Sequence, residues 1–207
     1  TEIARALFGI DGLTGGEIRW KGKPVKFSSP EDAIKAGIAY VPENRKSDGL
    51  FFNLTGFPNM TIARLDKLGG LFSLNLRREI EEGHRLVENL EISPAAETKT
   101  VDLLSGGNQQ KIVVGRWLFA GAELFILDEP TQGIDIGAKV AIYKLINSLT
   151  RAGHSVILIS SDHDELLAMS DRIAIVRHGC VETVRSAREI SKLDLVRASN
   201  ANMEAVA

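Results

Sequence analysis

The stretch that most constrains the fold of this chain is residues 104–111, taken together with residues 124–130 a short way downstream. In the first, a turn at Ser105–Gly107 runs into an apolar helix pattern, and in the second an apolar strand ends in Asp128 and Glu129. A strand without polar interruption is typical of the middle of a parallel sheet that helices cover on both faces. Ligands of open α/β sheets bind at the carboxyl ends of such strands. The two stretches therefore predict an α/β core with a site at the end of this strand.

Strand and helix patterns alternate through the rest of the chain. Downstream we expect, in order, a helix around 142–149, a strand at 156–159, a helix at 164–170, a strand at 173–176, a turn at 178–179 and a strand at 181–184. Upstream we expect a helix at 1–8, a hairpin turning at Gly22-Lys23, a helix after Ser29-Pro30, a strand at 38–41, and an amphipathic helix at 77–90 with Ile80, His84, Val87 and Leu90 on one face. The strand–helix alternation predicts right-handed parallel crossovers, and the hairpin predicts a small antiparallel part.

Composition excludes several classes of protein. With 207 residues and 44% hydrophobic content, the chain can bury one full core. A net charge of -2 with scattered basic residues argues against binding to nucleic acid. The single cysteine, Cys180, excludes an internal disulfide framework and fits a reducing cytoplasm. The most apolar run, 112–127, is too short to span a bilayer, so we expect any membrane connection to run through a partner protein.

The two stretches also carry the candidate chemistry. Backbone N–H groups of a glycine turn at a helix N-terminus can hold a phosphate. Of the two carboxylates, one can bind a divalent cation and the other can bind a water. Each stretch has a simpler explanation by itself: a capped helix start for Ser105–Gly107, and a polar strand end for Asp128-Glu129. Their joint presence, with Gln109 and Gln110 between them, favours nucleoside triphosphate chemistry.

These residues carry a resemblance to a known family. Leu-Ser-Gly-Gly-x-Gln-Gln at 104–110, followed by a hydrophobic strand into Asp-Glu-Pro-Thr at 128–131, resembles the nucleotide-binding domain of ABC ATPases. Residues 40–50 and 108–111 further resemble the second, C-terminal half of the tandem ATPase subunit of bacterial monosaccharide importers. The resemblance implies a P-loop NTPase-type ABC domain over residues 1–207, with a mostly parallel core sheet, a small antiparallel part, and a helical subdomain inserted at 44–101.

The resemblance also implies roles for individual residues. Asp128 would help to hold Mg²⁺, and Glu129 would polarise the attacking water as the catalytic residue. The nucleotide-binding positions that it implies are Ser105, Gly106, Gly107, Gln109, Glu43, Asp135 and Ser161. In this family the Ser-Gly-Gly signature serves the ATP that an opposite domain holds. Two positions depart from the usual pattern, because Glu43 stands where a glutamine is usual and Ser161 where a switch histidine is usual.

Two further positions need interpretation. His163 lies two residues beyond the expected switch position, and we interpret it as a first-turn helix residue. Thr1 takes the place of the Mg²⁺-binding hydroxyl that follows the phosphate loop in this family. The pattern Gly-x-x-x-x-Gly-Lys-Ser/Thr does not occur in residues 1–207, so we expect that the strand and loop which normally precede the first helix are missing here.

The expected function follows from the resemblance. It is an ATP-binding and ATP-hydrolysing domain of a sugar importer, with ATP and Mg²⁺ as cofactors. Expected partners are the N-terminal ATPase half of the same subunit or a second copy, and transmembrane permease subunits. The domain would be cytoplasmic and peripheral to the inner face of the membrane, without inserting into it. Two alternatives stay open: a regulatory half that binds nucleotide without hydrolysis, and a soluble ABC ATPase of translation or DNA repair.

Overall fold

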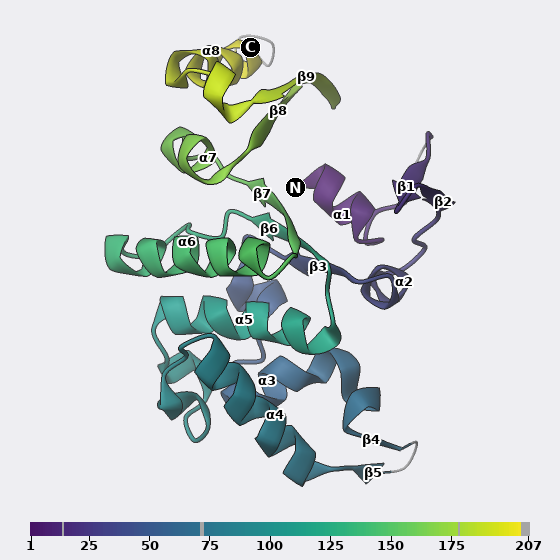
Figure 1. Cartoon of the computed structure of the whole chain (residues 1–207), viewed down its shortest axis with the longest axis vertical. Helices are drawn as coiled ribbons and strands as arrows, with labels where there is room; N and C mark the ends of the chain where they lie inside the picture. Colours follow the sequence, from purple (N-terminus) through teal and green to yellow (C-terminus); the bar gives the residue numbers. More distant parts are fainter. Residues whose placement is uncertain (14, 71–72, 178, 204–207) are drawn as a thin grey trace. The chain divides into compact units, whose positions relative to one another are not determined.

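The computed structural model describes residues 1–13, 15–70, 73–177 and 179–203, in two compact units at 1–157 and 158–207 (Figure 1). The α-helices are α1 Glu2–Leu7, α2 Pro30–Lys35, α3 Gly56–Thr61, α4 Leu76–Asn89, α5 Gly106–Ala120, α6 Ile136–Arg151, α7 His163–Met169 and α8 Lys192–Met203. The strands are β1 Ile18–Trp20, β2 Lys23–Val25, β3 Ile38–Val41, β4 Gly69–Gly70, β5 Ser73–Leu74, β6 Leu124–Asp128, β7 Ser155–Ile159, β8 Arg172–Arg177 and β9 Cys180–Ser186. A π-helical turn, Arg45–Gly49, and four short 3₁₀ segments, of which Ile62–Leu68 is the longest, complete the elements.

A parallel sheet forms the centre of the first unit. β3 pairs in parallel with β6, with Tyr40 beside Ile126 and Val41 beside Leu127, and the sheet order is β3-β6-β7. All four residues of β3 are buried, as are the last four of β6. The prediction of apolar strands in a covered α/β sheet is therefore confirmed for these two strands.

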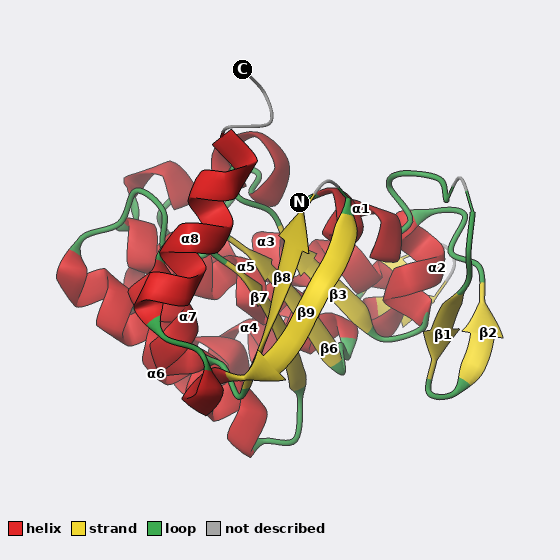
Figure 2. Ribbon diagram, turned by 90° about the horizontal axis from the view of Figure 1, so that it is seen from above, coloured by secondary structure: helices red, strands yellow, loops and turns green. Residues whose placement is uncertain are grey.

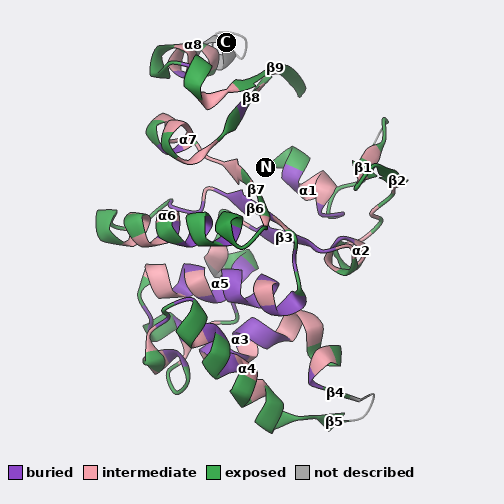
Figure 3. Cartoon of the chain, viewed as in Figure 1, coloured by how far each residue is buried: buried purple, intermediate pink, exposed green. Residues whose placement is uncertain are grey.

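Helix α5 is the main helix of the first unit. Its residues are buried on most sides, as the purple ribbon in Figure 3 shows. α5 packs against α3 on one side and α6 on another, and α3 in turn packs against α4. A helix covered on several sides is expected to be apolar around most of its circumference rather than along one stripe.

A buried polar cluster joins α5 to α3. The side chain of Arg116 is 7% exposed and donates from Nε to the carbonyl of Asn59 at 2.7 Å and from Nη2 to Asn59 Oδ1 at 3.2 Å. Burial lowers the pKa of the Arg116 guanidinium to about 10. The amide nitrogen of Asn59 donates to the carbonyls of Phe51 and Thr55, each at 2.9 Å. These bonds tie residues 51–55 and α3 to the middle of α5.

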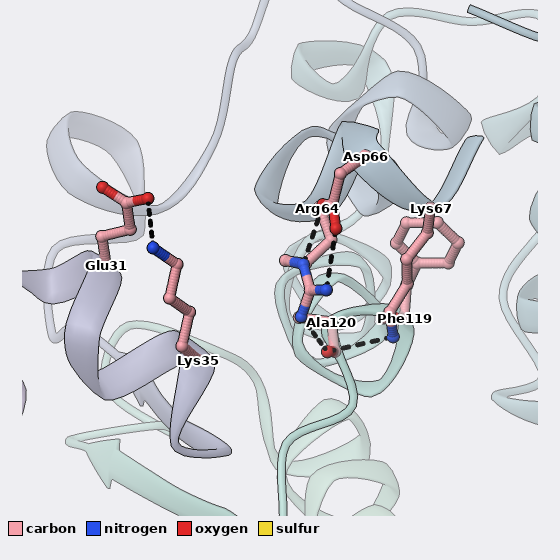
Figure 4. A network of polar contacts seen from close by, with 7 residues as sticks. All are labelled: Glu31, Lys35, Arg64, Asp66, Lys67, Phe119 and Ala120. Atoms are coloured by element: carbon pink, nitrogen blue, oxygen red, sulfur yellow. Dashed lines mark hydrogen bonds and ion pairs between the residues drawn. The ribbon is translucent and has the colours of Figure 1, made fainter. Parts of the chain in front are cut away.

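The C-terminal end of α5 is closed by the chain itself (Figure 4). Lys67 Nζ donates to the carbonyl of Phe119 at 2.7 Å and to that of Ala120 at 3.1 Å. Arg64, held by Asp66 through two 2.8 Å bonds, also reaches the Ala120 carbonyl. Gly121 then adopts the left-handed conformation, with φ of 88°, that commonly ends a helix. Cations at this end also suit the negative pole of the helix dipole.

The N-terminal part of the first unit agrees with the sequence in outline. Helix α1 lies within the predicted 1–8, and Ser29 caps α2 by accepting from the Asp32 amide. The hairpin β1–β2 turns at Lys21 and Gly22, with φ of 51° and 77°, one residue earlier than predicted. Two positive φ values in a two-residue loop are typical of a hairpin turn that suits the strand twist.

Helix α4 corrects one predicted packing position. It spans Leu76–Asn89, close to the predicted range, but Ile80 is 48% exposed whereas Leu86 and Leu90 are buried. The reason is that the face of α4 that meets its neighbours runs through Gly83, Leu86 and Leu90, and Glu79 on the same side accepts from the Thr61 hydroxyl at 2.6 Å, so Ile80 lies beside that face. His84, which the sequence places on the same face as Ile80, packs with its ring edge-on to Phe57, 5.1 Å between ring centres.

The second unit confirms one prediction of the sequence. Within its described residues β8 pairs antiparallel with β9, as Figure 2 shows, so the strands predicted at 173–176 and 181–184 pair as a hairpin. The short turn between β8 and β9 makes a hairpin the nearest source of backbone hydrogen bonds. His178 of that turn lies outside the described residues. Helix α8 ends at Met203. Ile173, Ile190 and Leu195 form the unit's own core.

Candidate functional site

Asp128, at the C-terminal end of β6, is the most constrained of the predicted site residues. It is 0% exposed, and the phenol of Tyr40 donates to its Oδ2 at 2.9 Å. Its other oxygen, Oδ1, is buried and has no hydrogen-bond partner in the described part of the chain. Burial, and then the hydrogen bond to Asp128, raise the pKa of Tyr40 well above its usual value, so the phenol stays a donor. The arrangement leaves one carboxylate oxygen in need of a ligand.

Glu129 follows in an unusual backbone conformation. Its φ is 47°, in the left-handed region that costs free energy for a residue with a side chain. Its carbonyl accepts from the Gln132 amide at 3.1 Å, which closes a turn directly after the strand. The half-buried Glu129 side chain therefore leaves the alternation of the strand at the point where ligands bind in such sheets.

The predicted phosphate turn forms the first residues of α5. Ser105 caps the helix, and its Oγ accepts from the Asn108 amide at 3.4 Å and from Asn108 Nδ2 at 2.9 Å. A Cβ on Gly106 would lie 3.0 Å from Arg45 Nη2 and 3.3 Å from Ile134 Cγ2. The absence of a side chain therefore lets Arg45 and the loop before α6 approach the turn, and it leaves backbone N–H groups at the positive end of a 15-residue helix.

Gln109 is hydrogen-bonded to the backbone that precedes the turn. It is 7% exposed, and its amide nitrogen donates to the carbonyls of Val101 at 3.0 Å and Leu104 at 3.1 Å. Its oxygen accepts from Arg45 Nε at 3.4 Å. These contacts favour a role in shaping the turn, whereas direct binding of nucleotide by Gln109 stays a prediction.

The remaining nucleotide-binding candidates lie at loop positions. Asp135 caps α6, with Oδ1 accepting from the Ala138 amide at 2.9 Å. Glu43 is exposed two residues beyond β3, and its carbonyl accepts from the Arg45 amide at 3.2 Å. Ser161 belongs to the second unit, so its position relative to Asp128 is not described. His163 opens α7, as predicted, and its Nε2 lies 3.0 Å from Ser199 Oγ.

Thr1 precedes α1, and its side chain makes no capping hydrogen bond to the helix. The other end of α1 is better anchored, because Phe8 contacts Tyr40 with ring centres 5.7 Å apart and Trp117 at 5.6 Å. This aromatic contact connects α1 to the strand beside Asp128 and to α5. A metal-binding role for the Thr1 hydroxyl stays a prediction.

The chemistry of the strand end fits Mg²⁺. The described residues contain no group of three or more His, Cys, Asp or Glu side chains that could hold a metal. Mg²⁺ does not require one, because it keeps several waters and takes one or two carboxylates together with the phosphates of a nucleotide. A buried carboxylate with one oxygen already engaged and the other without a partner is a suitable donor for it.

Sequence reasoning missed two residues of this region, Tyr40 and Arg45. The sequence places Tyr40 in a buried apolar strand, and the signal that could reveal its role is that a buried phenol needs a hydrogen-bond partner. In the sequence, Arg45 only supports the resemblance to one subfamily. Burial lowers the pKa of its guanidinium, which contacts the signature turn from a loop about 60 positions away, and no local pattern reveals that contact.

In the described part of the chain, no helix has the length and apolar character needed to cross a membrane.

Comparisons with known structures show the fold. An ATP-binding cassette solved as a dimer with ADP and phosphate aligns with a TM-score of 0.73 at 20% identity, covering 91% of this chain and 81% of that one. The protein cbiO1 of Clostridium perfringens, part of an ABC transporter complex, aligns with a TM-score of 0.75 at 19% identity, covering 99% and 80%.

Sequence comparisons show the family. The putative ribose/galactose/methyl galactoside import ATP-binding protein 1 of Agrobacterium fabrum is 43% identical over 95% of this chain and 39% of its own length. The ribose import ATP-binding protein RbsA 3 of Rubrobacter xylanophilus is 42% identical over 100% of this chain and 41% of its own length. The chain thus spans about two fifths of the length of these curated relatives. The ABC transporter family matches residues 1–132, and this chain belongs to that family.

Proposed function

We propose that this chain is an ATP-binding and ATP-hydrolysing domain of a sugar importer, acting at the cytoplasmic face of the membrane. The observation that carries the proposal is the buried end of β6, where one oxygen of Asp128 has no partner among the described residues and Glu129 follows in a strained turn. Sequence relatives that are named as ribose and galactose import ATP-binding proteins support the choice of substrate class.

Asp128 and Glu129 would have separate roles in hydrolysis. Asp128 would hold Mg²⁺ through Oδ1, directly or through a water, and Glu129 would orient and polarise the attacking water. Bound Mg²⁺ supplies positive charge that offsets the charge developing on the transferred phosphoryl group. Phosphoryl transfer requires mainly positioning and charge stabilisation, so a fixed carboxylate and a poised second carboxylate are suitable contributions from one domain.

The signature turn would act on a different ATP. Ser105, Gly106 and Gly107 lie at the open end of α5, and we assign them to the γ-phosphate of ATP held by a facing domain. That domain would be the N-terminal half of the same subunit or a second copy of this one. The solved dimeric cassette of the same fold supports a two-domain arrangement. Permease subunits would complete the importer, with residues 44–101 as the helical subdomain that meets them.

A regulatory role is the second candidate, and Glu43 is the observation that favours it. Glu43 places an exposed carboxylate where the family resemblance expects an amide. Next to a nucleotide this negative charge would repel the phosphates. A half that binds ATP without hydrolysing it would tolerate this change more easily than a catalytic one. The relatives named as import proteins make a soluble ABC ATPase of translation or repair the weaker alternative.

The test is Glu129→Gln in the full-length protein that carries this chain. The change keeps size and removes the charge, so we expect steady-state ATP turnover to fall by a factor on the order of 100 or more, typical for loss of a general base. Glu189→Gln is the matched control, the same chemical change at an exposed residue outside the candidate site, and should leave turnover unchanged. If Glu129→Gln retains full turnover while ATP binding persists, the catalytic assignment is wrong and the regulatory one holds.

A further inference from the structure

The hydroxyl of Tyr40 lies next to one of the two carboxylates assigned above. In the parallel pairing of β3 and β6, Tyr40 lies beside Ile126. Side chains two positions apart on a strand point to the same face, so Ile126 and Asp128 share a face. Tyr40 is therefore placed with its ring beside Ile126 and its hydroxyl near the carboxylate at the strand end, where its Oη lies 2.9 Å from Asp128 Oδ2.

We propose that Tyr40 is the positioning residue of the metal site: its O–H holds Asp128 Oδ2 and thereby presents Oδ1 as the oxygen that binds Mg²⁺ or its water. This inference rests on the proposed function, because it takes Asp128 as the metal carboxylate. Tyr40 itself touches neither metal nor nucleotide in this assignment and acts only through Asp128.

The physical reason is the softness of a carboxylate torsion. Rotation about the Cβ–Cγ bond of an aspartate is broad and roughly two-fold, so the backbone alone does not decide where its oxygens point. One hydrogen bond of good length makes the two oxygens inequivalent and fixes that torsion. Outer hydrogen bonds of this kind orient metal ligands and are nearly as important as the ligands themselves.

The phenol is itself held in place. The Tyr40 ring contacts Phe8 of α1 at 5.7 Å with a 45° tilt, and Phe8 lies edge-on to Trp117 of α5 at 5.6 Å. Tyr40 is 6% exposed, Phe8 6% and Trp117 7%. Three aromatic rings from α1, β3 and α5 thus restrict the movement of the hydroxyl, which a positioning role requires.

The simplest rival explanation is that Asp128 merely satisfies a buried phenol. The two explanations differ in what happens to the metal. If the bond serves only the phenol, replacing Tyr40 with phenylalanine costs stability and leaves metal affinity unchanged. If the bond orients Asp128, the same change weakens metal binding, and it does so only while Asp128 is a carboxylate.

The experiment titrates Mn²⁺, as a probe for Mg²⁺, into the full-length protein with bound nucleotide, followed by electron paramagnetic resonance and fitted with two sites. We expect Tyr40→Phe to weaken one site about 10- to 100-fold, the usual effect of losing an outer-shell partner. Binding of nucleotide in EDTA should change less than about two-fold, because the nucleotide itself loses no contact. Tyr143→Phe, the same chemical change in α6, is the matched control and should leave both affinities as they are.

A double variant separates this inference from the proposed function. Asp128→Asn should weaken the same Mn²⁺ site, and adding Tyr40→Phe should weaken it no further, because Tyr40 acts through the carboxylate. If Asp128→Asn has a large effect and Tyr40→Phe none, only the positioning role of Tyr40 is wrong. If neither variant changes Mn²⁺ affinity, the metal site of the proposed function fails, and the role of Tyr40 fails with it. Thermal unfolding of each variant identifies any loss that comes from misfolding.

Discussion

The two ends of helix α5 are built in opposite ways. At its C-terminal end, the side chains of Lys67 and Arg64 donate hydrogen bonds to the last carbonyls, and the left-handed Gly121 ends the helix. The chain therefore satisfies that end by itself. At its N-terminal end, Ser105 makes one long capping bond of 3.4 Å to the backbone, and Gly106 and Gly107 add no side chains. One end is satisfied within the molecule, whereas at the other the N–H groups of Gly106 and Gly107 have no acceptor among the described residues.

The difference teaches how one helix can be both part of the core and part of a site. The middle of α5 is fixed through Arg116 and Asn59, and its C-terminal end through Lys67. Because those anchors hold the helix, its first turn can stay open without loosening the fold. A rigid element that presents unsatisfied donors is well suited to recognise a phosphate, since no ordering is needed on binding.

The largest expected effect comes from Gly106→Ala at the open end. The new Cβ would meet only the ends of two flexible side chains, Arg45 Nη2 at 3.0 Å and Ile134 Cγ2 at 3.3 Å, so we expect the free energy of unfolding to stay within about 1 kcal/mol of the parent, helped by the better helix propensity of alanine. The methyl group would obstruct a phosphate at the turn, so ATP turnover of the full-length protein should fall about 100-fold. Phosphate release and urea unfolding measure the two quantities. Unchanged turnover would remove the turn from the nucleotide site.

An intermediate effect is expected from Gly115→Ala, the same substitution in the middle of the same helix. Its Cβ would lie 2.8 Å from Met60 Sδ and 3.1 Å from Leu90 Cδ1, inside a packed interface. Overpacking of this kind costs about 1–3 kcal/mol, partly offset by helix propensity, so we expect unfolding at lower urea. Turnover per folded molecule should be unchanged at saturating ATP. If Gly115→Ala lowered turnover and not stability, the contrast between the middle and the N-terminal end of α5 would break down.

The smallest effect is expected from Lys67→Met at the closed end. Methionine keeps most of the aliphatic stem but removes the donor to the Phe119 and Ala120 carbonyls. Loss of a cation that caps a helix C-terminus costs about 0.5–1 kcal/mol, so the melting temperature should fall by a few degrees. Lys26→Met, at an exposed position outside α5, provides the control. A drop no larger than that of the control would mean that Gly121 and Arg64 close this end sufficiently without Lys67.

The parts that could be predicted from sequence are those with strong local signals. Three such signals are Ser29-Pro30 at the start of α2, the glycine that ends α5, and the apolar residues of β3 and β6. Each of them strongly favours one local structure: a helix start, a helix end or a buried strand. Predictions failed where a distant partner decided the outcome. The exposure of Ile80 depends on which face of α4 meets its neighbours, whereas the hairpin of β8 and β9 is a local pairing that the sequence predicts.

The sequence alone determined the family and placed Asp128 and Glu129 at the end of an apolar strand, because the turn at 104–110 and that strand each carry a strong local signal. Only the tertiary structure decided which oxygen of Asp128 has no partner in the described part of the chain, because that depends on Tyr40 from a strand 88 positions away. The same holds for Arg45 against Gly106. Local signals arise from backbone conformation and burial, whereas the orientation of a polar group depends on contacts between residues far apart in the chain.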